Sequence, residues 1–213
     1  MPKTISTIAD LVQLCLDGLA ADERRLIGIC GPPGSGKSTL SETLRTSLET
    51  LRPGIAEVVP MDGFHLDNAV LDEIGARDRK GAPHTFDVGG FLALLRRLAR
   101  NEDAFIVVPT FDRDLDLSRG SARMITRSAQ VVIVEGNYLL LDDPRWEPVR
   151  SVFWRTCFID VPRHELERRL LDRWAEQGCD KQRAAHWVAT NDMPNVDLVL
   201  ERSVEAYWRL RQT

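Results

Sequence analysis

A glycine-rich segment at residues 31–39 carries the strongest chemical signal in this sequence. It reads Gly-Pro-Pro-Gly-Ser-Gly-Lys-Ser-Thr and matches the pattern G-x-x-x-x-G-K-[ST]. Glycines let backbone N–H groups converge on phosphate oxygens, and the start of a following helix adds a partial positive charge. In this pattern the lysine reaches the β- and γ-phosphates and the serine hydroxyl binds Mg²⁺. The predicted nucleotide-binding residues are Gly31, Pro33, Gly34, Ser35, Gly36, Lys37, Ser38 and Thr39.

Two carboxylates follow apolar runs elsewhere in the chain. Glu135 comes directly after four apolar residues, as a magnesium-binding carboxylate does at the end of a buried strand. Asp62 follows the apolar run at 55–59 and precedes Gly63, which would let the chain turn away. Asp62 would accept the proton of a substrate hydroxyl and would help Ser38 and Glu135 to hold Mg²⁺. The alternatives are a solvated strand end for Glu135 and an Asp-Gly turn without chemistry for Asp62.

Polar segments between the apolar runs are candidates to bind the molecule that accepts the phosphoryl group. They lie at residues 61–87 and 110–128 and contain a basic cluster and two Phe-Asp pairs. Such groups suit an anionic or polyhydroxy molecule, although each segment also fits an ion-paired or solvated loop. The predicted acceptor-binding residues are His65, Arg79, Lys80, Phe86, Asp112 and Arg113.

A second pair of cations falls on a predicted helix near the C-terminus. Arg169 and Arg173 are four residues apart and therefore share one helix face. Arginines on a lid can neutralise the charge that develops on a phosphoryl group during transfer. We therefore expect both arginines to act in catalysis, from a lid at about residues 162–180. A solvent-exposed face paired with neighbouring acidic residues is the alternative.

The hydrophobic pattern predicts the framework that positions these residues. Five short apolar runs predict strands, and they lie at 26–30, 55–59, 105–108, 130–134 and 158–160. Helical spacing follows at 5–19, 38–51, 66–74, 91–98, from 162 onward, 181–190 and 203–211. This alternation predicts a three-layer α/β/α fold of the P-loop NTPase type, with a five-stranded, mainly parallel sheet. Ligands of such sheets bind at the carboxyl ends of the strands, where the candidate residues fall.

Composition narrows the function classes. The 213 residues suit one domain over the whole sequence, with an N-terminal helix within residues 1–22. The 28 Lys and Arg against 32 Asp and Glu give a net charge of −4, which argues against a general nucleic-acid-binding surface. The four cysteines are dispersed and fit buried thiols in a reducing compartment. We expect a cytoplasmic protein without signal peptide or membrane span, monomeric or homodimeric, that binds neither nucleic acid nor a membrane.

Together these motifs resemble the uridine kinase and bacterial type I pantothenate kinase group of P-loop kinases. The resemblance covers about residues 24–200. It rests on the loop at 31–39 and on the motifs Asp62-Gly-Phe, Pro83-His-Thr-Phe-Asp, Pro109-Thr-Phe-Asp and Glu135-Gly. The Asp-Gly-Phe-His and Arg-Lys-Gly-Ala-Pro segments are also similar to a small bacterial group labelled nucleoside/nucleotide kinase-like, with members labelled fructose transport system kinases.

The resemblance implies roles for particular residues. It makes Asp62 the catalytic base, gives Glu135 a part in Mg²⁺ binding, and places Asn195 in a loop that borders the adenine. It predicts that ATP, with Mg²⁺, phosphorylates a hydroxyl of a nucleoside- or sugar-like metabolite. Phe111 stands where uridine kinases have tyrosine, a departure that leaves the acceptor open. We order the candidate acceptors as nucleoside, sugar, then pantothenate-like acid. A nucleotide switch or ATPase without a small acceptor is the alternative, but the sequence lacks the Asn-Lys-x-Asp motif of GTPases.

Overall fold

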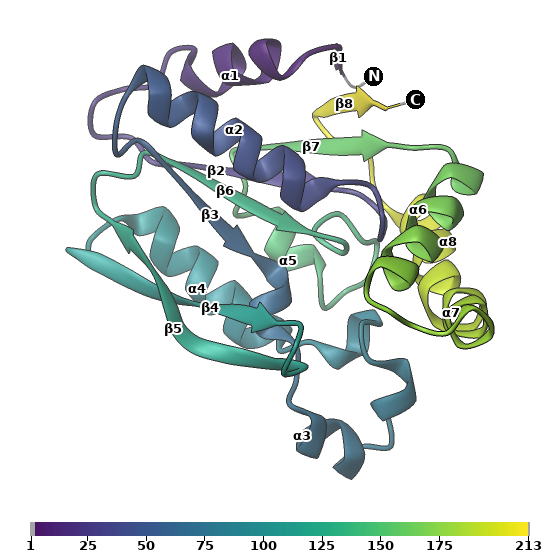
Figure 1. The fold of residues 1–213 in the computed structure, drawn as a ribbon. Coiled ribbons are helices and arrows are strands. Elements are labelled where there is room, and N and C mark those ends of the chain that lie inside the picture. Colours follow the sequence, from purple (N-terminus) through teal and green to yellow (C-terminus); the bar gives the residue numbers. More distant parts are fainter. Residues whose placement is uncertain (1–2, 213) are drawn as a thin grey trace.

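The computed structural model describes residues 3–212, which fold around a central parallel β-sheet (Figure 1). Its strands are β1 (Lys3–Ile5), β2 (Arg25–Cys30), β3 (Ala56–Pro60), β6 (Val131–Gly136), β7 (Arg155–Asp160) and β8 (Trp208–Arg211). The strand order is β1-β8-β7-β2-β6-β3, and every neighbouring pair is parallel. The predicted α/β class is confirmed, but this sheet has six strands instead of the five expected.

Helices cover both faces of the sheet and complete the three layers (Figure 1). They are α1 (Ile8–Leu16), α2 (Lys37–Leu51), α3 (Asn68–Glu73), α4 (Val88–Arg100), α5 (Glu147–Arg150), α6 (Arg163–Glu176), α7 (Lys181–Trp187) and α8 (Met193–Arg202). A π-helical turn at Val188–Asp192 joins α7 to α8. No helix within residues 3–212 is long and apolar enough to cross a membrane.

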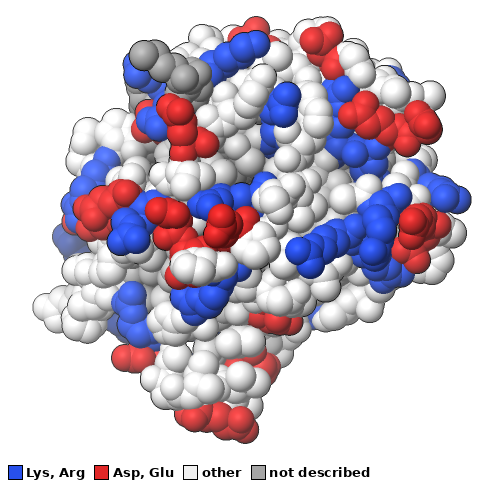
Figure 2. Space-filling view, turned by 180° about the vertical axis from the view of Figure 1, so that it is seen from behind, with Lys and Arg blue, Asp and Glu red and all other residues white. Residues whose placement is uncertain are grey.

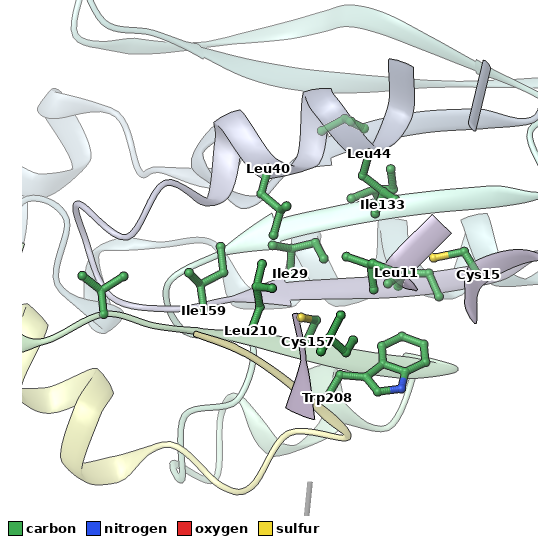
Figure 3. Close-up of a cluster of buried hydrophobic side chains, with 14 of the residues drawn as sticks. Leu11, Cys15, Ile29, Leu40, Leu44, Ile133, Cys157, Ile159, Trp208 and Leu210 are labelled. Carbon is green, nitrogen blue, oxygen red and sulfur yellow. The ribbon is translucent and has the colours of Figure 1, made fainter. Parts of the chain in front are cut away.

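Successive strand residues point to opposite faces and build two separate cores. Ile29 of β2 packs in the core that α1 and α2 close, with Leu11 and Leu44 among its members (Figure 3). Cys30, the next residue, belongs to the core on the other face, which contains Phe91 of α4. Since both faces are buried, β2 is apolar along almost its whole length, which explains why its position was predictable.

The third predicted strand forms, but its predicted place in the central sheet is wrong. Residues 105–108 belong to β4 (Phe105–Asp112), which leaves the sheet and pairs antiparallel with β5 (Leu117–Thr126), a segment predicted to be a loop. The inner side chains of this hairpin, Ile106 and Ile125, are buried in the second core, whereas Phe105 and Val107 are exposed. An apolar outer face made β4 resemble a fully buried strand, and the polar outer face of β5 hid its alternation.

The C-terminal segment was also predicted wrongly. Residues 203–211 were expected to form a helix, but they end in β8, which pairs with β7. Trp208 and Leu210 are buried and alternate with Arg209 and Arg211, which is the two-residue period of a strand. β8 also receives β1 as the edge strand, so the two ends of the described chain lie side by side (Figure 1).

The charges and the cysteines agree with the sequence analysis. Figure 2 shows Lys and Arg side chains lying next to Asp and Glu over the face that it presents. Cys15, Cys30 and Cys157 are buried free thiols, and Cys179 is partly buried. Burial raises the pKa of Cys15 and of Cys157 to about 12, so both stay protonated at neutral pH.

Candidate active site

The phosphate loop at residues 31–36 connects the carboxyl end of β2 to the start of α2. Gly36 is the N-cap of α2 and has a φ of 85°, a left-handed conformation that glycine adopts without strain. No side chain caps this helix, so the N–H groups of its first turn have no capping partner. Those N–H groups and the positive end of the helix form a site for an anion.

Lys37 and Ser38 are the first two residues of α2. The Nζ atom of Lys37 is buried and donates to the carbonyl oxygen of Pro32 at 3.0 Å. Burial lowers the pKa of Lys37, while the carboxylates of Glu135 and Asp62 act in the opposite direction. The Ser38 hydroxyl donates to Oε1 of Glu135 at 3.1 Å. The pKa of Lys37 therefore responds to both predicted carboxylates, and the Ser38 hydroxyl binds one of them.

The two carboxylates are brought together by neighbouring strands. Glu135 of β6 is in register with Pro60 of β3, so Asp62 begins just beyond the same end of the sheet. Burial, and then the negative charge of Asp62, raise the pKa of Glu135 to about 7. Two carboxylates and the hydroxyl of Ser38 fit Mg²⁺, which prefers oxygen ligands and takes its remaining ones from phosphates and water. No group of three His, Cys, Asp or Glu side chains that could hold a metal ion by itself occurs within residues 3–212.

Each of the two carboxylates is followed by a glycine, and another segment packs closely against each glycine. A Cβ atom on Gly63 would lie 2.4 Å from the carbonyl oxygen of Pro109 in β4. A Cβ atom on Gly136 would lie 2.6 Å from Cβ of Met61. Gly63 was predicted to let the chain turn away. Its φ is not positive, so close packing, and not an unusual backbone conformation, requires glycine at this position. These contacts fix the one-turn 3₁₀ helix at Met61–Phe64 against β4 and β6.

Arginines approach the carboxylates from the hairpin and from the helices near the C-terminus. Nη2 of Arg113, which follows β4, lies 3.1 Å from Oδ2 of Asp62. Arg173 of α6 lies 3.7 Å from Asp192, and burial lowers its pKa. Arg169, one turn earlier, binds Glu165 at 2.7 Å. In this conformation Arg113 is the arginine that contacts the predicted base, whereas both predicted lid arginines are bound to acidic residues of their own region.

His65 forms an aromatic cluster with Phe86 and Phe111. Its ring centroid lies 4.1 Å from that of Phe86 and 4.5 Å from that of Phe111. Nδ1 of His65 is 2.8 Å from the carbonyl oxygen of Asp62. Burial lowers the pKa of His65, so the neutral ring is favoured at neutral pH. The rings of His65 and Phe111 are tilted by 41° to each other, and these two residues form an aromatic wall of the cavity that Asp62 also lines.

Lys80 is held by three oxygen atoms instead of facing a ligand alone. Its Nζ donates to Oδ1 of Asn68 and to the carbonyl oxygen of Asp116, both at 2.7 Å, and lies 2.9 Å from Oδ1 of Asp116. The carbonyl oxygen of Lys80 accepts from Nδ2 of Asn191 at 3.1 Å. The loop that carries Lys80 therefore connects the β4–β5 hairpin with the π-helical turn before α8.

A cavity of about 950 Å³ joins these groups at the carboxyl ends of the strands. Fourteen of the predicted residues line it. They are Pro33, Gly34, Gly36, Lys37, Ser38, Thr39, Asp62, His65, Lys80, Arg113, Glu135, Arg169, Arg173 and Asn195. Most of the residues that were singled out in the sequence therefore lie around one cavity.

Five predicted residues lie outside the lining of this cavity. Gly31 and Ser35 are buried inside the phosphate loop, and Phe86 lies behind His65. Arg79 lies apart from the other candidates, because its guanidinium donates to the carbonyl oxygen of Thr190 and the residue lines a separate hollow. Asp112 is likewise used within the hairpin, where it pairs with Arg119 at 3.5 Å and accepts from the Leu115 amide.

The helices near the C-terminus contribute cavity residues that sequence reasoning missed. Trp174 and Trp187 line the cavity with their rings 6.2 Å apart, and Asp192 accepts from Nε1 of Trp174 at 2.8 Å. Asn137, two residues after Glu135, also lines the cavity. Its position after a strand end was the signal that could have identified it.

Comparisons with known proteins give close relatives. No protein-family model matches the sequence. The chain is 38% identical over 185 residues to the protein YggC of Escherichia coli K12, covering 86% of this chain and 76% of that one. It is 30% identical over 207 residues to "Putative uridine kinase C227.14" of Schizosaccharomyces pombe, covering 94% and 88%. A crystal structure titled "putative fructose transport system kinase" from Silicibacter sp. TM1040 matches with a TM-score of 0.88 at 38% identity, covering 96% and 99%.

Proposed function

This chain belongs to the uridine kinase-like P-loop kinases, and from that membership we propose that it transfers the γ-phosphoryl group of ATP to a hydroxyl of a neutral nucleoside- or sugar-like metabolite. One observation carries the proposal. The phosphate loop, the Ser38–Glu135 hydrogen bond and the carboxylate of Asp62 open into the same cavity. A nucleotide switch needs the first two of these but has no use for a base beside an aromatic wall.

The chain's own residues account for each part of the transfer. The N–H groups of the loop and Lys37 bind the phosphates, while Ser38, Glu135 and Asp62 would hold Mg²⁺, which supplies positive charge to the phosphate oxygens. The acceptor oxygen bonds to the γ-phosphorus as the bond to the bridging oxygen of ADP breaks. Asp62 takes the proton of the acceptor hydroxyl. Because such transition states are loose, orientation and charge stabilisation provide most of the catalysis.

Arginines complete the electrostatic part of the proposal. Arg113 already contacts Asp62 at 3.1 Å and orients this carboxylate. Arg169 and Arg173 line the cavity from the lid helix and would turn toward the transferred phosphoryl group when ATP binds. Asn195 also lines the cavity, and we assign it to the adenine.

The ion pairs of the acceptor side favour a neutral acceptor over a pantothenate-like acid. We define the acceptor side as the cavity residues between Asp62 and Asp116. Its three cations, Arg77, Lys80 and Arg113, are each within 3.3 Å of a carboxylate oxygen of this chain. An acidic acceptor would have to displace these carboxylates, whereas a neutral polyol would leave the pairs intact.

An ADP-release screen over nucleosides, sugars and hydroxy acids tests the function. We expect ATP consumption that rises sharply with one neutral hydroxyl compound. Asp62→Asn should lower kcat about 10²- to 10⁴-fold, the range for a lost general base, and leave ATP binding intact. Asp22→Asn is the control, because Asp22 is exposed and precedes the opposite end of β2. Slow ATP hydrolysis that no hydroxyl compound stimulates would instead support the switch.

A further inference from the structure

A second hollow adjoins the active-site cavity and takes no part in the proposed reaction. Its volume is about 410 Å³, within the range of about 300–1,000 Å³ that is typical of small-molecule sites. The loop that carries Arg79, the segment after β6 and helix α8 form it. Asn195 lines both spaces, whereas Lys37, Asp62 and Glu135 line the cavity only. The hollow is therefore a neighbour of the catalytic site and separate from it.

The charged groups of this hollow do not balance one another. Two carboxylates line it, together with three arginines, Arg79, Arg145 and Arg202. Asp143 pairs with Arg145 at 3.0 Å, and Asp142 lies 3.7 Å from Arg150, which is outside the hollow. Within residues 3–212, neither Arg79 nor Arg202 forms an ion pair with a carboxylate. Two positive charges of the hollow thus have no counter-charge of their own.

The two unpaired arginines come from different segments that meet at the hollow. Nη1 of Arg79 donates to the carbonyl oxygen of Thr190 at 2.8 Å, which leaves its other N–H groups without a partner within residues 3–212. Arg202 is the last residue of α8, and its carbonyl oxygen accepts from the Asp142 amide at 2.7 Å. Hydrogen bonding by Arg145, and then the charge of Arg202, lower the pKa of Asp143, so the Arg202 guanidinium lies near this carboxylate.

The acceptor side of the main cavity differs from this hollow in its ion pairing. Its cations Arg77, Lys80 and Arg113 are each within 3.3 Å of a carboxylate oxygen. An anion that entered there would have to displace those carboxylates, because every cation is already neutralised. In the hollow, an anion would meet two guanidinium groups that carboxylates leave free.

We propose that this hollow binds a small organic phosphate, with Arg79 and Arg202 on its phosphate group. Guanidinium groups present forked N–H donors that match phosphate oxygens, and two of them suit a group with about 1.5 to 2 negative charges at neutral pH. Apolar side chains, among them Pro83, Leu141 and Leu198, line the hollow as well and would contact the organic part of the ligand. The inference does not depend on the proposed kinase function.

Isothermal titration calorimetry tests the site on protein saturated with Mg²⁺ and a non-hydrolysable ATP analogue, which fills the phosphate loop. The probes are inorganic phosphate, uridine 5′-monophosphate and D-fructose 1-phosphate, and uridine and D-fructose are the phosphate-free controls. Arg79→Gln and Arg202→Gln each remove one charge from the hollow. Arg96→Gln is the matched control, because Arg96 is an exposed arginine of α4 outside the hollow. Arg113→Gln reports on binding in the main cavity instead.

We expect at least one of the two organic phosphates to bind, and its phosphate-free form to bind in a way that neither hollow variant alters. Arg79→Gln and Arg202→Gln should each raise Kd for the organic phosphate by about 10- to 100-fold, the loss of a hydrogen bond to a charged group. Arg79→Lys keeps the charge and should retain part of the affinity. Arg96→Gln and Arg113→Gln should bind as the wild type does. An unchanged Tm without ligand establishes that each variant is folded.

Three results would overturn the inference. The first is that no organic phosphate binds the saturated protein, or that inorganic phosphate binds as tightly as both organic phosphates do. The second is a Kd that Arg79→Gln and Arg202→Gln leave unchanged. The third is an equal loss of affinity in Arg113→Gln, which would place the ligand in the main cavity. Acceptor-dependent ADP release is measured separately, so none of these outcomes decides the kinase function.

Discussion

Replacing Gly63 by alanine should damage both the fold and the predicted base. The added Cβ atom would lie 2.4 Å from the carbonyl oxygen of Pro109 and 2.7 Å from its carbonyl carbon, both backbone atoms of β4. An ordinary contact between carbon and a carbonyl oxygen is about 3.3–3.6 Å, so the 3₁₀ turn or the hairpin must move by about 1 Å. Asp62 is the residue next to Gly63, and this displacement would move it directly.

The expected magnitudes follow from that displacement. Overpacking of this kind costs about 1–3 kcal/mol of unfolding free energy. For a chain of this size each kcal/mol shifts Tm by about 2–4 °C, so we expect Tm to fall by about 2–12 °C. A misplacement of about 1 Å in a catalytic group can lower the rate about 100-fold, and kcat should fall by about that factor.

Calorimetry and acceptor-dependent ADP release measure the two effects. Gly120→Ala is the matched control, because a Cβ atom there would have no heavy atom within 4 Å and the residue lies in exposed β5. A Gly63→Ala protein with the Tm and kcat of the Gly120→Ala protein would refute the argument that close packing requires this glycine. A lowered Tm with unchanged kcat would refute only the connection between the packing and the base.

Three further changes give independent tests. Asp192→Asn should lower kcat about 10-fold, because Arg173 would lose the carboxylate that lies 3.7 Å away. Asp197→Asn, which breaks the ion pair between Arg163 of α6 and Asp197 of α8, should not. Burial raises the pKa of Asp192, so the folded state binds its proton more tightly than the unfolded state and stability falls as pH rises above about 4; a Tm difference between Asp192→Asn and wild type that stays constant from pH 4 to 7 would contradict this. Glu135→Gln should keep the Ser38 contact but lose most of the extra Tm that Mg²⁺ adds to ATP alone, and an unchanged Mg²⁺ effect in thermal unfolding would exclude Glu135 as a ligand.

The phosphate loop and the carboxylates were predictable because their signals are local. A strand, a glycine-rich turn and a helix start follow one another within the sequence, and the pattern itself states which backbone groups face a phosphate. Asp62 and Glu135 were singled out because each comes at or just beyond the end of a predicted strand, and parallel strands end at one edge. No long-range information was needed for these residues.

The hairpin and the last strand were mispredicted because burial was misjudged. β4 is apolar on its exposed face as well, and an apolar run of that length does not reveal whether it joins the main sheet. β8 is four residues long, too short for its alternation to outweigh the helical spacing around it. Arg79 and Asp112 were assigned to the acceptor for their charge, but nearby backbone and ion-pair partners bind them first.

Local patterns in the sequence were enough to predict the α/β fold class and to locate the phosphate loop, Asp62 and Glu135 near strand ends. Their surroundings became known only from the folded structure. It showed that close packing requires Gly63, that the acceptor-side cations are already paired, and that Asp192 binds Arg173 and Trp174. These features arise from contacts between segments that are far apart in the chain, and the pattern of one segment carries no record of its partner.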